Sequence, residues 1–252
     1  MARRHALRDD QWERVERLLP GRKEAVGVTA KDNRLFVEAV LYRYRAGIPW
    51  RDLPERFGPW KAVHPRFSRR AEKGVWENAF KRLADDADNG YAMLDSAVVR
   101  AHQRGAGAKK EGQDEAIGRS KGGLSAKIHA TTDALGNPTG LLLTPGQASD
   151  LEGADALSPD LKARALLADK AYDADERALD PLRQAGKTAV IPPKRNRVVQ
   201  RSHDRELCKE RHLIESFFCK LKQYRAIASR HDKTARHFLA AIYLASTVIW
   251  LN

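Results

Sequence analysis

Three acidic residues stand where a carboxylate has a chemical use. Asp95 and Asp169 lie in or directly after short apolar runs, in YAMLDSAVVRAH and ALLADKAY, and Glu215 lies in RHLIESFFCKLK. A carboxylate in a buried strand is costly unless it is paired or binds a metal ion. Three carboxylates are the minimum set that can hold two hard divalent cations against phosphate. The residue types therefore indicate metal-dependent chemistry on a phosphodiester.

The third of these residues lies in a segment, Cys208 to Lys233, that has helical periodicity. Its apolar residues predict a buried stripe on one face, made of Ile214, Phe217, Leu221 and Tyr224. Arg211, Glu215 and Lys222 fall near the opposite side. Taken alone, this pattern is that of a surface helix with an intrahelical ion pair. Only the two aspartate segments make a catalytic role for Glu215 the better interpretation.

Several stretches together resemble one family from end to end. They are IPWRDLPERFGPW, LDSAVVRAHQ, KGGLSAKIHATTDALGNP, LTPGQASD, LLADKAYD, IPPK and RHLIESFFCKLKQYRAIASRHDKTA. In these the chain resembles insertion-sequence transposases of the IS-five group. The resemblance implies a ribonuclease-H-like core with an Asp-Asp-Glu triad, here Asp95, Asp169 and Glu215.

The resemblance also implies the cofactor and the reaction. Two Mg²⁺ (or Mn²⁺) ions would be bound, with Asp95 bridging them, Asp169 on one and Glu215 on the other. Carboxylates are ligands that Mg²⁺ accepts, and two ions can serve both the attacking and the leaving oxygen. Water would attack first, and the freed 3′-hydroxyl of the DNA would then attack the target. Asp173 and Asp175 are close enough in sequence to be confused with Asp169.

The overall charge is strongly basic. The 252 residues carry a net charge of +13, with a pI near 9.9, which favours a polyanionic partner. The only cysteines, Cys208 and Cys219, lack metal-ligand spacing and lie three turns apart on the predicted helix, too far to bridge. Neither a signal peptide nor a long apolar span is present, so we expect no membrane association and a bacterial cytoplasmic, nucleoid-associated protein.

Residues 1–90 are predicted to be a small, all-helical domain that binds DNA ends. A helix capped by Asp9 or Asp10 and a second over residues 32–46 precede a short helix near residues 54–57. A glycine turn and a basic helix over residues 60–71 complete a helix-turn-helix outline. Residues 41–73 hold nine basic and three acidic side chains. The residues predicted to contact DNA here are Lys61, His64, Arg66 and Arg69.

Three positions depart from the family's pattern. Pro65 lies inside the predicted reading helix, where it removes a backbone donor. Arg70 stands where family members usually have Trp, and Cys208 stands at a Tyr position of the signature around the catalytic Glu. These departures leave open whether this copy is active.

Residues 91–252 are predicted to be the catalytic domain, of mixed α/β class. The order of elements is β-β-β-α-β-α-β-α, which predicts a ribonuclease-H-like mixed sheet flanked by helices. In that sheet the first and fourth strands are neighbours, which would bring Asp95 and Asp169 together. Basic residues predicted to contact DNA in this part are Arg211, Lys222, Lys121 and Lys127.

These features favour a transposase that binds terminal inverted repeats and target DNA and cuts and joins strands as a homodimer or higher homo-oligomer. One alternative is a catalytically inactive copy that acts as a sequence-specific DNA-binding protein. Another is a nuclease for RNA–DNA hybrids, which the N-terminal helical domain disfavours.

Overall fold

The computed structural model describes residues 5–22, 30–105 and 115–252. The chain forms two compact units, neither of which is one continuous stretch. The first comprises Met1–Leu83, His102–Glu115 and Leu221–Asn252, and the second comprises Ala84–Ala101 and Ala116–Lys220. The sequence predicted a single division at residue 90. The units differ from it because the C-terminal helix is nearly all apolar and packs with the N-terminal helices.

Helices build the first unit. They are α1 (Asp9–Glu16), α2 (Asn33–Ala46), α3 (Trp60–Glu72), α4 (Val75–Ala84), α9 (Arg225–Ala228) and α10 (Ala235–Trp250), with single 3₁₀ turns at Trp50–Asp52, Glu55–Phe57 and Gln103–Gly105 and a two-residue strand, β7 (Ser229–Arg230). Asp32 caps α2 by accepting from the Leu35 amide at 2.8 Å, and Gly47 ends it with φ of 73°. The N-cap of α1 is Arg8, not the predicted Asp9 or Asp10, which lie in the first turn.

The region around α3 differs from the predicted helix-turn-helix outline. The expected short helix is a 3₁₀ turn, Glu55–Phe57, which Gly58 ends with φ of 80°. α3 passes through Pro65 without a break, and Gly74, with φ of 64°, joins it closely to α4. Only Lys73 and Gly74 thus separate α3 from α4.

A charged cluster lies inside the first unit. Arg43 and Asp232 are buried and their charged atoms lie 3.3 Å apart, and the Tyr44 hydroxyl donates to Asp232 at 3.2 Å. The fully buried guanidinium of Arg230 donates to the Asp232 carbonyl and lies over the Phe238 ring. Each buried charge thus has a partner, which the low dielectric of the interior requires. The aromatic core of α2, α3 and α10 surrounds the cluster.

A mixed sheet forms the second unit. Its strands are β1 (Ala92–Ala101), β2 (Gly118–Ser120), β3 (Gly123–Thr132), β4 (Pro138–Pro145), β5 (Ala165–Leu167) and β6 (Thr188–Val190). β3 is antiparallel to β1, β2 and β4, whereas β1, β5 and β6 are parallel to one another. β4 and β2 both pair with β3, which is followed across the sheet by β1, β5 and β6. The predicted mixed sheet is confirmed, and the predicted neighbours, the first and fourth strands, are β1 and β5. The short β2 was not predicted; it lies near the end of residues 104–123, which the sequence predicts to be a polar, glycine- and lysine-rich loop and of which residues 106–114 lie outside the described residues.

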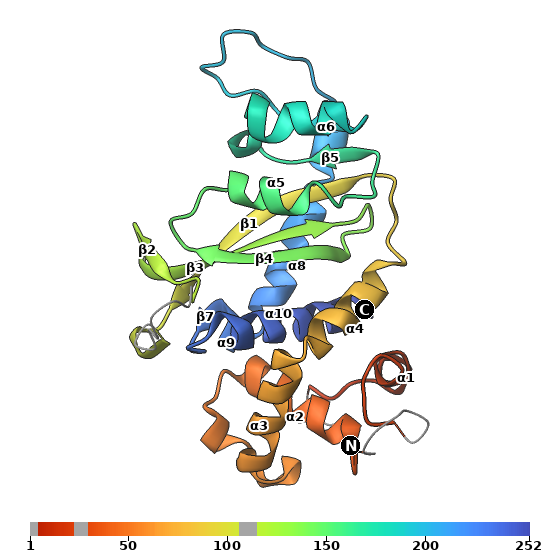
Figure 1. The fold of residues 1–252 in the computed structure, drawn as a ribbon, viewed down its shortest axis with the longest axis vertical. Helices are drawn as coiled ribbons and strands as arrows, with labels where there is room; N and C mark the ends of the chain where they lie inside the picture. The colour runs from red at the N-terminus through yellow and green to blue at the C-terminus, as the bar shows by residue number, and fades with distance from the viewer. Residues whose placement is uncertain (1–4, 23–29, 106–114) are drawn as a thin grey trace. The chain divides into compact units, whose positions relative to one another are not determined.

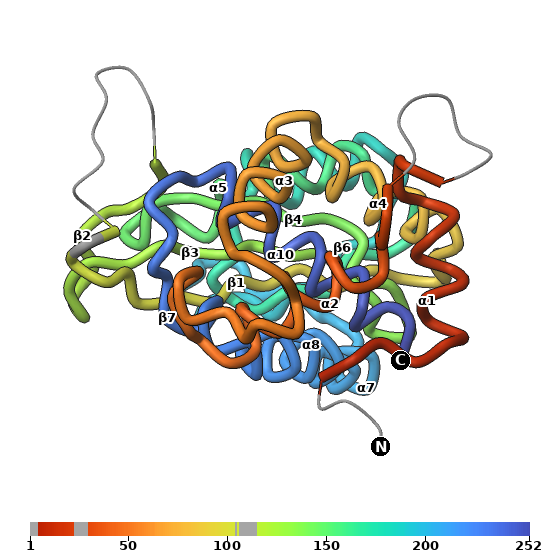
Figure 2. Tube along the Cα trace, turned by 90° about the horizontal axis from the view of Figure 1, so that it is seen from below, coloured from red at the N-terminus to blue at the C-terminus, as the bar shows by residue number. Residues whose placement is uncertain are grey.

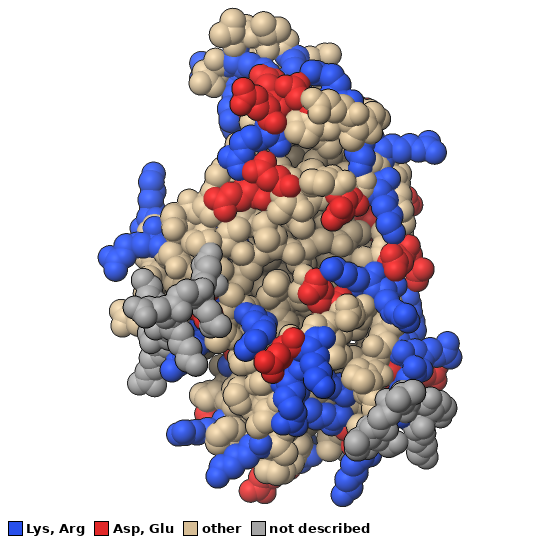
Figure 3. Space-filling model, viewed as in Figure 1, with Lys and Arg blue, Asp and Glu red and all other residues tan. Residues whose placement is uncertain are grey.

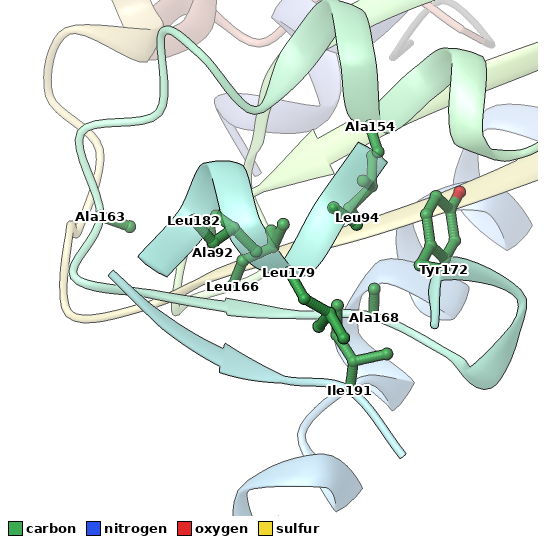
Figure 4. Packing of buried hydrophobic residues seen from close by; sticks show 11 residues of the cluster. Ala92, Leu94, Ala154, Ala163, Leu166, Ala168, Tyr172, Leu179, Leu182 and Ile191 are labelled. Carbon is green, nitrogen blue, oxygen red and sulfur yellow. The ribbon is translucent and has the colours of Figure 1, made fainter. Parts of the chain in front are cut away.

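Helices cover both faces of this sheet. They are α5 (Leu151–Leu157), a π-helical turn over Asp175–Leu179, α6 (Asp180–Gln184), α7 (Arg205–Lys209) and α8 (His212–Lys222), with a 3₁₀ turn at Lys170–Tyr172. Figures 1 and 2 show α5 and α8 on opposite faces. A buried cluster packs β1 and β5 against α5 and α6. It includes Leu94 and Leu166 from the strands and Ala154 and Leu182 from the helices (Figure 4). The sequence also predicts a helix over residues 174–185, and the structure has one over residues 175–184, whose first turn is π-helical and runs directly into α6.

In the described part of the chain no helix is long and apolar enough to cross a membrane.

Candidate active site

Asp95 lies on the fourth residue of β1, the central strand of the sheet. Met93 and Leu94 before it are fully buried, and Asp95 itself is half-buried. Its Oδ1 accepts from the Ser96 amide at 2.7 Å. In the β1–β3 register it stands opposite Ala130, a residue without a bulky side chain. The strand thus holds the carboxylate in a fixed place with one oxygen atom free of backbone contacts.

Asp169 follows the end of β5, the parallel neighbour of β1. The register pairs Ala92 with Leu166 and Met93 with Leu167. Extending that register by two residues places Asp95 opposite Asp169, on strands that lie roughly 4.8 Å apart. Oδ1 of Asp169 accepts from the Ala171 amide at 2.7 Å and so caps the 3₁₀ turn that follows. The two predicted aspartates are therefore brought together by strand register.

Glu215 lies in the first turn of α8 with its side chain exposed. Ile214, Phe217 and Leu221 are buried as predicted, and Phe218 joins them. The predicted continuous helix is wrong, however. The segment breaks into α7, α8 and α9, with Arg211 between the first two and Tyr224 before the third, so Cys208 and Cys219 lie on different helices.

The start of α8 is fixed by close packing against the hairpin between β3 and β4. A Cβ on Gly136 would lie 3.1 Å from the Leu213 Cβ, and Gly136 has φ of 82°. Only glycine satisfies both the turn and this close approach. The hairpin turn thus sets where the first turn of α8, and with it Glu215, can lie.

The three carboxylates are electrostatically coupled. Burial raises the pKa of Asp95, the Ser96 amide and Arg211 lower it, and Asp169 and Glu215 raise it again. The Arg211 guanidinium lies 3.7 Å from Asp95 Oδ2. Mutual repulsion among carboxylates is what a bound cation relieves, so the donor set fits Mg²⁺ or Mn²⁺. In the described residues, however, no three acidic, histidine or cysteine side chains are already arranged to hold an ion.

A network beside Asp95 was not predicted from the sequence. Ser96 Oγ donates to Asp150 Oδ1 at 2.6 Å, and Lys127 Nζ donates to the same oxygen at 2.8 Å and to the Ala148 carbonyl at 2.6 Å. Lys127, which the sequence predicts to contact DNA, is buried and forms an ion pair with Asp150. Asp150 also occupies the N-cap position of α5, but its side chain makes no cap hydrogen bond. The only sequence signal was the aspartate that ends LTPGQASD.

Asp173, which could have been confused with Asp169, is in a different environment. It is buried, and it accepts from the Lys194 amide at 2.7 Å and from the guanidinium groups of Arg197 and Arg201. Burial raises its pKa, but these hydrogen bonds together bring the pKa below its ordinary value. With its oxygens engaged by the loop after β6, Asp173 is suited to a structural role rather than to metal binding.

The four predicted DNA contacts on α3 fall into two pairs. Arg66 donates to Asn33 Oδ1 at 2.6 Å and lies over the Phe36 ring, and the His64 ring packs against Trp50. Lys61 and Arg69 are exposed. Figure 3 shows Lys and Arg side chains gathered around α3 on the face in view. Of the four, Lys61 and Arg69 are thus accessible to a partner, whereas His64 and Arg66 also pack within the helical unit.

The positions that depart from the family's pattern are also located. Arg70 is buried, donates to the Pro20 carbonyl and Asn33 Oδ1, and has its pKa lowered by burial and by Arg66 to about 10. Cys208 is half-buried on α7. Lys121, in the β2–β3 turn, and Lys222, at the end of α8, are exposed.

With this geometry in place, comparison with known proteins decides the family. Residues 91–251 match the family described as "Transposase DDE domain". The chain belongs to the DDE transposase family. Residues 7–80 also match the family described as "Putative transposase of IS4/5 family". Proteins of the DDE family generally use divalent metal ions, in keeping with three coupled carboxylates.

The chain is also similar to individual proteins and solved structures. The chain is 40% identical over 130 residues to a "Putative transposase for insertion sequence element IS6501" of Brucella ovis, which is 51% of this chain and 100% of that protein. It is 46% identical over 104 residues to "Uncharacterized protein y4sN" of Sinorhizobium fredii, 41% of this chain and 83% of the relative. Among solved structures, a pre-cleavage Mos1 transpososome is 11% identical, with a TM-score of 0.30, over 89% of this chain and 80% of that one.

Proposed function

We propose that this DDE transposase binds the terminal inverted repeats of its own insertion sequence and cleaves and rejoins DNA there with two divalent metal ions. The observation that carries the proposal is the β1–β5 register, whose extension sets Asp95 opposite Asp169. The raised pKa of Asp95, to which Asp169 and Glu215 contribute after burial, supports Glu215 as the third member. The net charge of +13 and the exposed cations of α3 support DNA as the substrate.

Each residue of the site has a role in this proposal. Asp95, Asp169 and Glu215 would hold the two divalent ions, Mg²⁺ or Mn²⁺. When bound, the ions make the attacking oxygen nucleophilic and neutralise the leaving oxygen. Arg211 lies beside Asp95 and limits the repulsion among the carboxylates before the ions bind. The Ser96 amide fixes the rotamer of Asp95, and Asp150 holds Ser96 in turn.

The test is nicking of labelled duplexes that carry the DNA flanking the gene. Asp95→Asn, Asp169→Asn and Glu215→Gln should each abolish Mg²⁺-dependent nicking. Binding to the same duplex should stay near wild type or tighten, because a negative charge facing phosphate is removed. Glu176→Gln, which alters an exposed carboxylate beyond the site, is the matched control and should cleave normally.

Two results would overturn parts of this proposal. Cleavage by any one of the three variants would remove that residue from the triad. Specific binding by the wild-type chain with no cleavage in Mg²⁺ or Mn²⁺ would identify a catalytically inactive, DNA-binding copy. The departures at Arg70 and Cys208 make that second result the relevant alternative.

A further inference from the structure

A basic cleft opens directly beside Asp169. It has a volume of about 350 Å³ and is lined by Asp169, Lys170, Ala171, Lys194, Arg195 and Asn196. That volume is at the small end of the range for ligand sites. One wall is the segment that follows β5, and the other is the loop that follows β6. The cleft therefore joins a predicted catalytic residue to a loop that the catalytic assignment leaves without a role.

The loop is anchored to the catalytic segment by one buried carboxylate. Asp173 lies four residues after Asp169 and accepts from the Lys194 amide at 2.7 Å and from Arg197 Nη1 at 2.7 Å. Arg201 donates to it as well. Because Asp173 is buried and fully engaged, it fixes the backbone on which Lys194 and Arg195 stand. The cleft is thus a preorganised feature of the fold.

The charges of the cleft are unequal. Arg197 and Arg201 are neutralised by Asp173 and Asp175. Lys170, Lys194 and Arg195 form no ion pair within the described residues, and Asp169 is the one acidic residue in the lining. Lys170 and Arg195 are exposed and Lys194 is half-buried. Three unpaired cations converge on a space large enough for a small anionic group.

We propose that this cleft binds a backbone phosphate of the DNA strand adjacent to the phosphate being cleaved. This rests on the proposed function, which puts the scissile phosphate at Asp169. Lys194 and Arg195 supply charge, and the Asn196 amide can donate a hydrogen bond to a phosphate oxygen. Asp173 acts as a positioning residue, since it orders the loop without touching DNA. The contact carries no sequence information and sets the register of the strand over the triad.

The first experiment measures binding of end DNA against salt concentration, in EDTA so that no cleavage occurs. Lys194→Ala and Arg195→Ala should each lower the salt slope of binding by about one unit, and the double variant by about two. The matched control is Lys162→Ala with Arg183→Ala, which removes the same charge from exposed positions of the same unit. A double variant whose slope and affinity equal those of this control would overturn the proposal.

The second experiment locates the phosphate. Single methylphosphonates, which are neutral, are placed in turn at backbone positions within a few nucleotides of the cleavage site. At one position the substitution should weaken wild-type binding but add no further loss to the Lys194→Ala, Arg195→Ala variant, which is the coupling expected of a direct contact. Additive losses at every position would overturn the proposal.

The two proposals fail in distinguishable ways. If Asp169→Asn abolishes nicking while Lys194→Ala and Arg195→Ala behave like the control, only the cleft assignment is wrong. If the wild-type chain neither nicks nor prefers end DNA to random DNA, the proposed function is wrong and the cleft proposal is overturned with it.

Discussion

Asp95 and Asp173 are both shielded carboxylates, yet their neighbours give them opposite properties. Burial and the charges of Asp169 and Glu215 raise the pKa of Asp95. The pKa of Asp173 is lowered, despite its burial, by the Lys194 amide and two arginines. An ionised Asp95 is therefore destabilised until a cation arrives, whereas an ionised Asp173 is already satisfied. No pattern in the sequence indicated the environment of Asp173, since that environment comes from the loop after β6.

At the residue scale, His129 predicts a pH-dependent loss of stability. It is fully buried on β3, and burial, followed by the charge of Lys127, lowers its pKa to about 4. The unfolded chain, with a pKa near 6.5, binds the proton first, so the contribution of His129 is complete above about pH 6.5 and lost as pH falls towards about 4. The loss is on the order of 3 kcal/mol from this residue.

The measurement is urea unfolding between pH 4 and pH 7. His129→Gln should flatten the decline in unfolding free energy over that range, because the titrating group is gone. The exposed His212 provides the control, and His212→Gln should leave the slope as in the wild type. An unchanged slope in His129→Gln would show that other groups account for the decline in unfolding free energy. Candidates are His64 and His237, whose pKa values are also lowered by burial.

At the scale of a single element, we expect different residues of α3 to stabilise the fold and to contact DNA. Arg66→Ala removes the bond to Asn33 and the packing on Phe36, so it should lower the unfolding free energy by about 1–3 kcal/mol. Lys61→Ala and Arg69→Ala should change it by no more than about 0.5 kcal/mol, since both are exposed. They should instead lower the salt slope of end-DNA binding by about one unit each.

Chemical unfolding and fluorescence anisotropy at several salt concentrations together test this division. Lys81→Ala, on the neighbouring α4, removes an exposed lysine of the same unit and serves as the reference. If Arg66→Ala leaves the unfolding free energy unchanged but weakens DNA binding, then the contacts of Arg66 with Asn33 and Phe36 do not stabilise the fold. Arg66 would then be a DNA contact, as the sequence predicts.

The elements also show where sequence patterns stop being informative. Alternating or continuous apolar runs predicted β1, β3, β4, β5 and β6 in their order along the chain. They did so because burial in a sheet produces a periodic or continuous apolar pattern in the sequence. The continuous helix predicted around Glu215 is divided into α7, α8 and α9, and the first turn of α8 packs against Gly136, which is distant in sequence. Lys127 was predicted to contact DNA, but its partner Asp150 lies 23 residues away on the other side of a hairpin. Contacts of this kind leave no local signal.

At the scale of the whole molecule, the net charge and the way the chain is divided between the two units limit what the sequence can predict. The net charge of +13 was informative about a polyanionic partner, but it did not say which cations face it. Several cations make their contacts inside the helical unit, including Arg43, Arg66, Arg70 and Arg230. The discontinuity of that unit was likewise invisible, because an apolar C-terminal helix can pack on either part of the chain. Hence DNA contacts have to be sought among the exposed cations.

Lys222 is an exposed cation on the same helix as Glu215. It follows Glu215 by seven residues on α8, within about 20° of two full turns, whereas Lys220 projects about 140° away. If Lys222 contacts a backbone phosphate while Glu215 binds metal, Lys222→Ala should lose affinity for end DNA and lower the salt slope by about one unit. Lys222→Arg should recover much of the affinity but less of the cleavage, since the position of the charge near the metal ions matters. Lys220→Ala removes the same charge from another face. Equal slopes and normal cleavage in both alanine variants would make Lys222 an ordinary solvated residue.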